Sequence, residues 1–336
     1  MKRSSRSLVP MIALAVLGGL SPAPALAAPA PTAVPLVTKT VALRKPSKLS
    51  SQWSRIQKLT YGTSASKLGT SPGGDNLRWG PDYGVQVPDK TWWYADAAKL
   101  RLAHYSDSGR YLGQVKLPKK YLAQGVYFQW ANPMALSDGT VVLTSTTIDA
   151  PALLKLSPAH KLSRVTLPTF VNLVSVDKKL LYGFDEDDHV VRVDPKAGTV
   201  KTVGTLKGQG GRAFNLSVGS GYVSVTRPGL KLRLDLVAPD YPGLTVHPSI
   251  EAAMSANGRL WILITGVVEV GVDEAHDVIG LLNVDADGNV SAVSRVRTPT
   301  SDADPGDGHH LGLRYGGTHP TLMFIDTDAA RVYRKK

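Results

Sequence analysis

The chain has 336 residues, no cysteine and a formal net charge of +12. A chain of this length can bury a sizeable core, and the lack of cysteine excludes a disulfide scaffold and a lipoprotein anchored through a thiol. Ten basic residues and no acidic residue precede Asp75, which leaves +2 of the +12 for residues 75–336. A nearly neutral body does not favour nucleic-acid binding, which requires a basic surface on the domain itself.

The first 27 residues have the pattern of a secretory signal peptide. Three basic residues within the first six precede an apolar run over residues 8–20, and a small-x-small cleavage site follows at Ala25-Leu26-Ala27. The apolar run is shorter than a membrane span. We therefore expect cleavage after Ala27 and a secreted, extracellular bacterial protein, with an uncleaved membrane anchor as the alternative.

Residues 28–52 predict an extended, basic linker rich in Pro and Ala, because they show no sustained amphipathic period. The basic residues of segment 39–48 suit a contact with an anionic cell-wall polymer or a membrane surface, or a solvated leader with no partner. A wall-associated structural protein is a further alternative.

Residues 53–336 predict a single all-β domain built from repeats. Six apolar runs lie next to turns, at 91–95, 140–144, 179–184, 221–226, 259–265 and 321–325. Their anchors are Trp93, Val142, Leu181, Val223, Trp261 and Met323. Repeats of about 40–50 residues are typical of propeller blades, which bury both faces of a four-stranded sheet. We predict a six-bladed β-propeller, with seven blades as the alternative because the last interval is long.

The N-terminal part of this domain is expected to close the ring. The last repeat offers three strand-like segments, at 311–315, 321–325 and 330–334. A blade with three strands would leave an exposed sheet edge. The strand-like segment 55–61 is therefore predicted to supply the missing outer strand.

Two repeats share a spacing of Asp and Arg between apolar strands. Asp96 is followed by Arg101 within residues 91–114, and Asp326 is followed by Arg331. These segments resemble NHL repeats, and the resemblance implies that the Asp and the Arg pair at the corner of a blade and that the domain serves as an interaction platform. Repeats two to five lack the pair.

The channel mouth is the predicted ligand site, because each innermost strand of a propeller begins near one mouth. The residues at those positions are Tyr83, Asn132, Asn172, Asn215, Glu251 and His310. Amide and carboxylate oxygens suit calcium or another divalent ion. Alternatively, the Asn side chains cap strand ends around a water-filled channel.

In architecture, and in the segment 250–261, the chain is similar to the gluconolactonase-like (SMP-30-like) propellers. That resemblance implies a metal site formed by Glu251, Asn132, Asn172 and Asn215.

Two further stretches carry metal-binding residue types. One is His309-His310, with Asp304, Asp307 and His319 nearby, and the other is the acidic loop 185–189. Adjacent histidines in an extended segment point to opposite faces, so a shared zinc ion is not favoured, although one of them could act as a general base. We expect both stretches to be solvated loops. Trp92 and Trp130 are candidates either for core packing or for a sugar-stacking surface.

Catalytic motifs have little support: Gly219-Ser220-Gly221 lacks the spacing and context of a nucleophile elbow, and the sequence has no His-Glu-x-x-His, no Walker loop and no dinucleotide fingerprint. We therefore expect a monomer that binds a small molecule or an extracellular protein at the channel mouth without catalysis. The alternative is a metal-dependent lactonase or esterase-like hydrolase, in which a divalent ion held by Glu251 and the Asn residues polarises a carbonyl.

Overall fold

The computed structural model describes twelve segments, which begin after the predicted signal peptide. They are residues 34–45, 51–72, 78–79, 84–123, 128–208, 211–254, 259–269, 275–285, 287–294, 310–315, 320–325 and 329–336. No helix among these residues has the length and apolar character needed to cross a membrane.

Six sheets follow one another along the chain and form the blades. Blades 1, 2, 3 and 5 each take four antiparallel strands from one continuous stretch. Blade 1 contains β5 (Gly84–Gln86), β6 (Trp92–Asp96), β7 (Arg101–Tyr105) and β8 (Tyr111–Lys116). Blade 2 contains β9 (Trp130–Ala135), β10 (Val141–Ser145), β11 (Ala152–Leu156) and β12 (Leu162–Thr166). Blade 3 contains β13 (Asn172–Asp177), β14 (Leu180–Phe184), β15 (Val190–Asp194) and β16 (Thr199–Thr202). Blade 5 contains β21 (Val246–Met254), β22 (Leu260–Glu269), β23 (Ala275–Val284) and β24 (Val290–Ser294).

Blades 4 and 6 take only three full strands from their own stretch. Blade 4 contains β18 (Ala213–Gly219), β19 (Tyr222–Arg227) and β20 (Leu230–Val237), with the short β17 (Leu206–Lys207) beside β18. Blade 6 contains β25 (His310–Tyr315), β26 (Pro320–Ile325) and β27 (Ala329–Lys335). Outside the blades lie the pair β3 (Ser71–Pro72) and β4 (Arg78–Trp79) and the short helices η2 (Ala97–Lys99) and η3 (Lys119–Tyr121).

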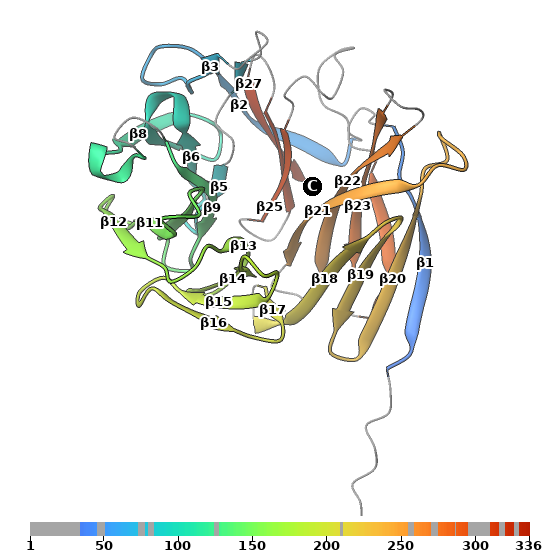
Figure 1. Ribbon diagram of the computed structural model, residues 1–336. Coiled ribbons are helices and arrows are strands. Elements are labelled where there is room, and N and C mark those ends of the chain that lie inside the picture. The colour runs from blue at the N-terminus through green and yellow to red at the C-terminus, as the bar shows by residue number, and fades with distance from the viewer. Residues whose placement is uncertain are drawn as a thin grey trace, which may run out of the picture. The chain divides into compact units, whose positions relative to one another are not determined.

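The innermost strands join the blades into a ring (Figure 1). Contacts run from β5 to β9, from β9 to β13, from β13 to β17, from β18 to β21, from β21 to β25 and from β25 back to β5. The prediction of six blades is therefore confirmed, and the seven-bladed alternative is wrong. Tight hairpins within the blades turn at glycines in the left-handed region, such as Gly109 and Gly139, as the Ser-Gly and Asp-Gly pairs indicate.

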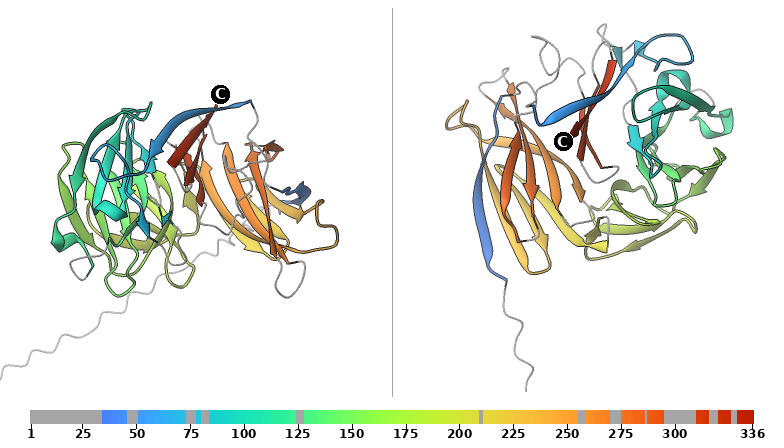
Figure 2. Two further views of the ribbon diagram at one scale, coloured as in Figure 1. Left: turned by 90° about the horizontal axis from the view of Figure 1, so that it is seen from above. Right: turned by 180° about the vertical axis from the view of Figure 1, so that it is seen from behind.

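Blade 6 is completed by β2 (Trp53–Thr60), as the sequence predicts. This strand pairs antiparallel with β27, from Trp53 opposite Lys335 to Thr60 opposite Ala329 (Figure 2). Trp53 and Leu59 are buried, on alternate sides of the strand. N- and C-terminal segments of the domain thus share one sheet, which leaves no open edge at the closure.

Blade 4 is completed by β1 (Leu36–Ala42), which lies inside the segment that the sequence predicts to be a linker. The linker prediction is therefore wrong for this stretch: it is extended, but it forms the outer strand beside β20, and the pairing is parallel. The physical reason lies in the chain after β20. Only residues 238–245 separate β20 from β21, too few for a strand of average length and its two turns.

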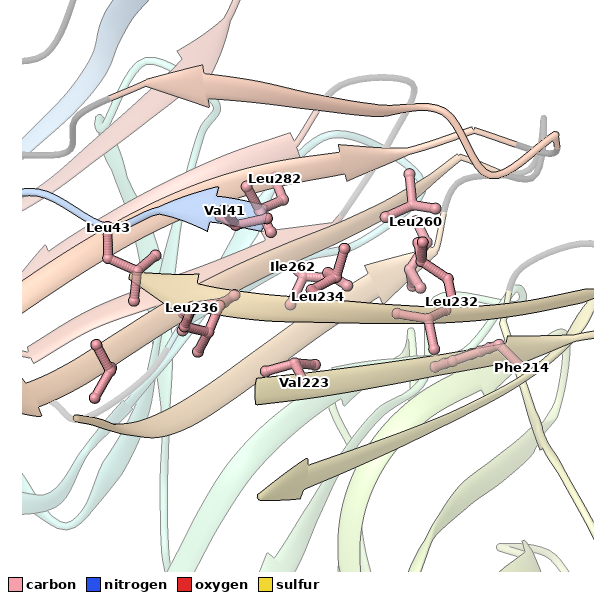
Figure 3. Packing of buried hydrophobic residues seen from close by; sticks show 14 of the residues in the cluster. Val41, Leu43, Phe214, Val223, Leu232, Leu234, Leu236, Leu260, Ile262 and Leu282 are labelled. Atoms are coloured by element: carbon pink, nitrogen blue, oxygen red, sulfur yellow. The ribbon is translucent and has the colours of Figure 1, made fainter. Parts of the chain in front are cut away.

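The segment around β1 also contributes to the core. Val41 and Leu43 belong to the hydrophobic cluster that joins blades 3, 4 and 5 (Figure 3), and the exposed fraction of Leu43 is 0%. Burial of such side chains stabilises the fold by about 1.5–3 kcal/mol each. Beyond β1, Arg44 exchanges two backbone hydrogen bonds with Ile279 of β23. Residues 34–45 therefore tie blade 4 to blade 5.

Deletion of residues 53–62 is expected to abolish cooperative unfolding, because β27 would lose its partner strand and the buried Trp53 and Leu59 would be removed. Differential scanning calorimetry measures this directly. The double variant Arg55→Ala/Thr60→Ala is the control, since both side chains are exposed on the same strand and surface substitutions change stability by about 0.5 kcal/mol or less. An unaltered melting transition in the deletion variant would rule out the closure role of β2.

Candidate functional site

A bulge in β9 displays Asn132 at the start of the innermost strand of blade 2. The register between β9 and β10 shifts between Val142 and Thr144, so that β9 contains one extra residue. Asn132 adopts the left-handed conformation, with φ of 49°, which asparagine tolerates better than most residues. Bulges of this kind change the direction of a side chain, and they are frequent beside binding sites.

A second bulge lies at the same place in blade 3. The register between β13 and β14 shifts between Leu173 and Ser175, with Val174 as the extra residue, whereas Asn172 precedes the bulge and pairs regularly with Phe184. Gly183 of β14 lies so close that a Cβ on it would be 2.1 Å from the carbonyl oxygen of Asn172. Only glycine permits this approach, so Gly183 fixes the position of Asn172.

Asn132 and Asn172 meet between the two blades, and we call these two residues the amide pair. Asn132 Nδ2 donates a hydrogen bond of 3.5 Å to Asn172 Oδ1. Within the described residues, Asn132 Oδ1 and Asn172 Nδ2 make no further hydrogen bond. One acceptor and one donor, from adjacent blades, are therefore left available for a ligand, and Asn172 is exposed.

Neighbouring loops hold the chain just before each amide. In blade 2, Thr147 Oγ1 donates to Gln129 Oε1 at 3.2 Å, and the backbone N–H of Thr146 donates to the Gln129 carbonyl. In blade 3, Glu186 Oε1 accepts from Thr169 Oγ1 at 3.2 Å and from the N–H of Phe170 at 3.1 Å. Both amides therefore sit on backbone that is fixed in place.

The other residues predicted for the channel mouth do not join the amide pair in the same way. Asn215 forms its hydrogen bonds within its own blade, since its Oδ1 accepts from Leu206 N and its Nδ2 donates to the carbonyl of Gly204. This is the capping role that the sequence analysis offers as the alternative to a ligand role. Glu251 is half-buried on β21, opposite Leu263. Tyr83 and the side chain of His310 lie outside the described residues.

Of the predicted metal set, Asn132 and Asn172 lie within hydrogen-bond distance of each other. In the described part of the chain, one other group has ligand atoms close enough for an ion: Asp185, Asp187 and His189 of the acidic loop, whose ligand atoms lie within 4.8 Å of one another. Asp185 Oδ1 accepts from the backbone N–H groups of Asp187 and His189, at 3.1 and 2.9 Å. This turn geometry brings the three residues together without an ion.

The Asp–Arg pair implied by the NHL-like spacing is present in blade 1. Arg101 Nε lies 2.7 Å from Asp96 Oδ2, and the side chains of both residues are almost fully buried. The remaining polar atoms of this pair bind the backbone of the preceding loop: Arg101 Nη1 donates to the carbonyl of Ala65, and Asp96 accepts from the N–H of Gly69. These bonds offset the cost of burying the ion pair. Asp326, the acidic residue of the second pair, lies outside the described residues.

The two tryptophans whose role the sequence does not decide lie in the core. Trp92 and Trp130 have exposed fractions of 0% and 2%, so neither presents a face for sugar stacking. Their nitrogen atoms are bonded as well: Trp92 Nε1 donates to Asp107 Oδ1, and Trp130 Nε1 donates to the carbonyl of Tyr121.

A polar network that the sequence analysis missed joins blade 6 to blade 1 at the closure. Asp107 accepts two hydrogen bonds from Arg334, at 2.7 and 2.9 Å, and a third from Gln86 Nε2 at 2.8 Å. The hydrogen bonds from Arg334 are the main cause that lowers the pKa of Asp107. Asp107 lies in the turn between the third and fourth strands, which is at the opposite end of the blade from the start of an inner strand. This network therefore serves closure and is separate from the amide pair.

A cluster of aromatic rings joins blades 1 and 2. Trp93 and His104 stack with ring centroids 4.1 Å apart, and His160, from the turn between β11 and β12, meets both rings edge-on at 5.0 and 5.5 Å. His104 Nε2 lies 2.8 Å from Thr91 Oγ1. Burial, followed by the nearby His160, lowers the pKa of His104, and Asp89 opposes this shift.

The blade topology and the ring of inner strands define a six-bladed β-propeller, whose candidate site lies at the start of the inner strands of blades 2 and 3. Within that class, the chain belongs to a family described as a domain of unknown function, DUF7485, whose model matches residues 51–335. No curated protein matches the chain.

Solved structures with a similar arrangement include three proteins of different activity. Virginiamycin B lyase from Staphylococcus aureus is 11% identical, covers 84% of this chain and 99% of its own, and has a TM-score of 0.41. The calcium-binding protein regucalcin from Agrobacterium tumefaciens is 12% identical, with coverage of 76% and 90% and a TM-score of 0.40. The PQQ-bound aldose sugar dehydrogenase from Streptomyces coelicolor is 11% identical, with coverage of 86% and 99% and a TM-score of 0.43. Their activities are not transferred to this chain.

Acidification is expected to destabilise the contact between blades 1 and 2. Because the folded state lowers the pKa of His104, the unfolded chain takes up a proton more readily as the pH falls through the ordinary value of 6.5. The free energy of unfolding should therefore decrease with falling pH in this range. Between pH 8 and pH 5, the free energy of unfolding measured with urea should fall less for His104→Gln than for the unsubstituted protein. His247→Gln, at an exposed position of β21, is the control; an equal loss in all three proteins would contradict the assignment.

Proposed function

We propose that this chain is a secreted β-propeller that binds a small, neutral, polar ligand at the amide pair without chemical turnover. The observation that carries the proposal is the hydrogen bond that joins Asn132 and Asn172 near the start of the inner strands of two adjacent blades. The left-handed backbone of Asn132 and the close approach between Gly183 and the Asn172 carbonyl constrain the chain at both positions. A binding role for the two amides would give these local constraints a function.

The chemistry of the amide pair favours binding over catalysis. An amide side chain offers both a donor and an acceptor but does not ionise near neutral pH, so it cannot act as a general acid or base. The same combination of donor and acceptor matches the hydroxyl groups of a sugar, each of which also donates and accepts. We therefore take neutral oligosaccharides as the first ligand class to test.

The proposal that the protein is secreted rests only on the N-terminal sequence pattern. The basic segment that follows this pattern contacts the protein itself in several places. Lys39 Nζ donates to the carbonyl of Gly288, Arg44 forms an ion pair with Asp240 at 3.2 Å, and Lys45 lies over the ring of Tyr241. These contacts support a role of the segment within the fold more strongly than a role as a tether to wall polymer.

An array of labelled neutral oligosaccharides tests the binding proposal. The double variant Asn132→Ala/Asn172→Ala should lose about ten- to one-hundred-fold in affinity for the sugars that bind the unsubstituted protein, because about two hydrogen bonds of 0.5–1.5 kcal/mol each are removed. Asn289→Ala, which removes an exposed amide from a hairpin turn of blade 5, should bind as before. Equal binding by all three proteins, or no binding of any sugar, would contradict the proposal.

Metal dependence distinguishes this proposal from the hydrolase alternative. We expect the same Tm in calcium, in zinc and in a chelator, because the amide pair consists of two neutral side chains. A bound ion would raise Tm by mass action. A rise that persists in Asp187→Asn, in which the acidic loop is altered, but is lost in Asn172→Ala would favour the metal-dependent hydrolase instead.

A further inference from the structure

The outer edge of β20 is an acceptor site for one extended strand. Blade 4 has no outer strand of its own, and a parallel ladder fills the position, from Leu36 opposite Lys231 to Ala42 opposite Val237. Parallel strands cannot be joined by a tight hairpin, so the occupant must come from a distant part of the chain. The edge of β20 therefore binds the added strand only through backbone pairing and side-chain packing.

The features that fit this edge are contained within residues 36–45. Val41 and Leu43 enter the core of blades 4 and 5 (Figure 3), Arg44 pairs with the backbone of Ile279, and the side chain of Arg44 forms its ion pair with Asp240. The rest of the domain does not need to be covalently attached to this segment for these contacts to form. Any copy of the segment presents the same complementary features.

The family model supports the view that β1 is a separable element. Its match to the chain begins at residue 51, after β1 and immediately before β2. The part of the chain that defines the family thus includes the acceptor edge but excludes the strand that occupies it here.

We propose that the edge of β20 also accepts residues 36–45 of a second copy of this chain, so that two copies exchange β1 in a symmetric dimer. This inference is independent of the ligand proposed for the amide pair. The contacts are the same whether β1 comes from the same copy or from another. The linker between β1 and β2 therefore determines the ratio of monomer to exchanged dimer. A short link gives an effective concentration on the order of millimolar, so exchange is expected at high protein concentration or during concentrated refolding.

The absence of cysteine from the sequence permits a direct test with introduced thiols. One chain carries Leu36→Cys, and a second chain with a different tag carries Lys231→Cys; the two positions face each other at the exposed end of the ladder. The chains are mixed, unfolded, refolded at increasing concentration and oxidised. If β1 of one copy occupies β20 of the other, disulfide-linked heterodimers should accumulate with concentration.

A matched mixture measures random cross-linking. It combines Arg192→Cys and Lys201→Cys chains, whose positions face each other across the β15–β16 hairpin, where exchange between copies is not expected. The exchange pair should give several times more heterodimer than this control at the highest concentration. Equal yields at every concentration would overturn the proposal, provided that circular dichroism shows both mixtures refolded.

A second experiment shortens the link between β1 and β2. Removal of residues 46–50 shortens the maximum reach of the link by about 17 Å and disfavours occupation by the same copy. The variant should sediment as a dimer at concentrations where the unsubstituted protein is a monomer. A monomer with an unchanged melting transition would contradict the proposal, and if this variant does not fold, the thiol mixture decides alone.

Discussion

Backbone pairing between the N-terminal segment and two distant blades is the constraint on which this structure depends. Each of these blades needs a strand from outside its own stretch, because without it the side chains that the strand buries, such as Val41 and Trp53, would be missing from the core. Here residues 36–60 supply that strand twice, in parallel to β20 and antiparallel to β27. The ring is thus held by a single N-terminal segment that is paired at both of its ends.

The sequence predicts the antiparallel half of this arrangement but not the parallel half. Residues 311–334 offer three strands, so a fourth had to come from elsewhere, and the segment after Trp53 has a strand-like pattern. No comparable signal marks β1, because its outward side chains are polar or exposed and a parallel partner needs no turn nearby. The available signal was the shortness of segment 238–245 after β20. The spacing of the anchor residues does not reveal that blade 4 lacks an outer strand of its own, since Val223 falls at the expected interval.

For the site, position in the repeat does not predict the hydrogen-bond partners of the residues. Asn132 and Asn172 bond to each other, whereas Asn215 satisfies the backbone of its own blade. Asn172 and Asn215 both stand in regular ladder pairs, opposite Phe184 and Thr226, so their different partners follow from the packing around each blade and leave no clear sequence pattern. The Asp96–Arg101 pair was predictable because both residues lie in one hairpin. Asp107 and Arg334 were not, because ring closure brings together residues from opposite ends of the domain.

The parallel strand also has a kinetic consequence. Leu36 pairs with Lys231 and Trp53 with Lys335, so each of these two strands must wait for a partner that is synthesised much later. Contacts between residues this far apart slow folding, because a long loop must close before they form. Until Lys335 has been made, blades 4 and 6 cannot both be complete. For a chain that we propose to be exported, this delay favours an unfolded polypeptide during passage and a single cooperative assembly after release.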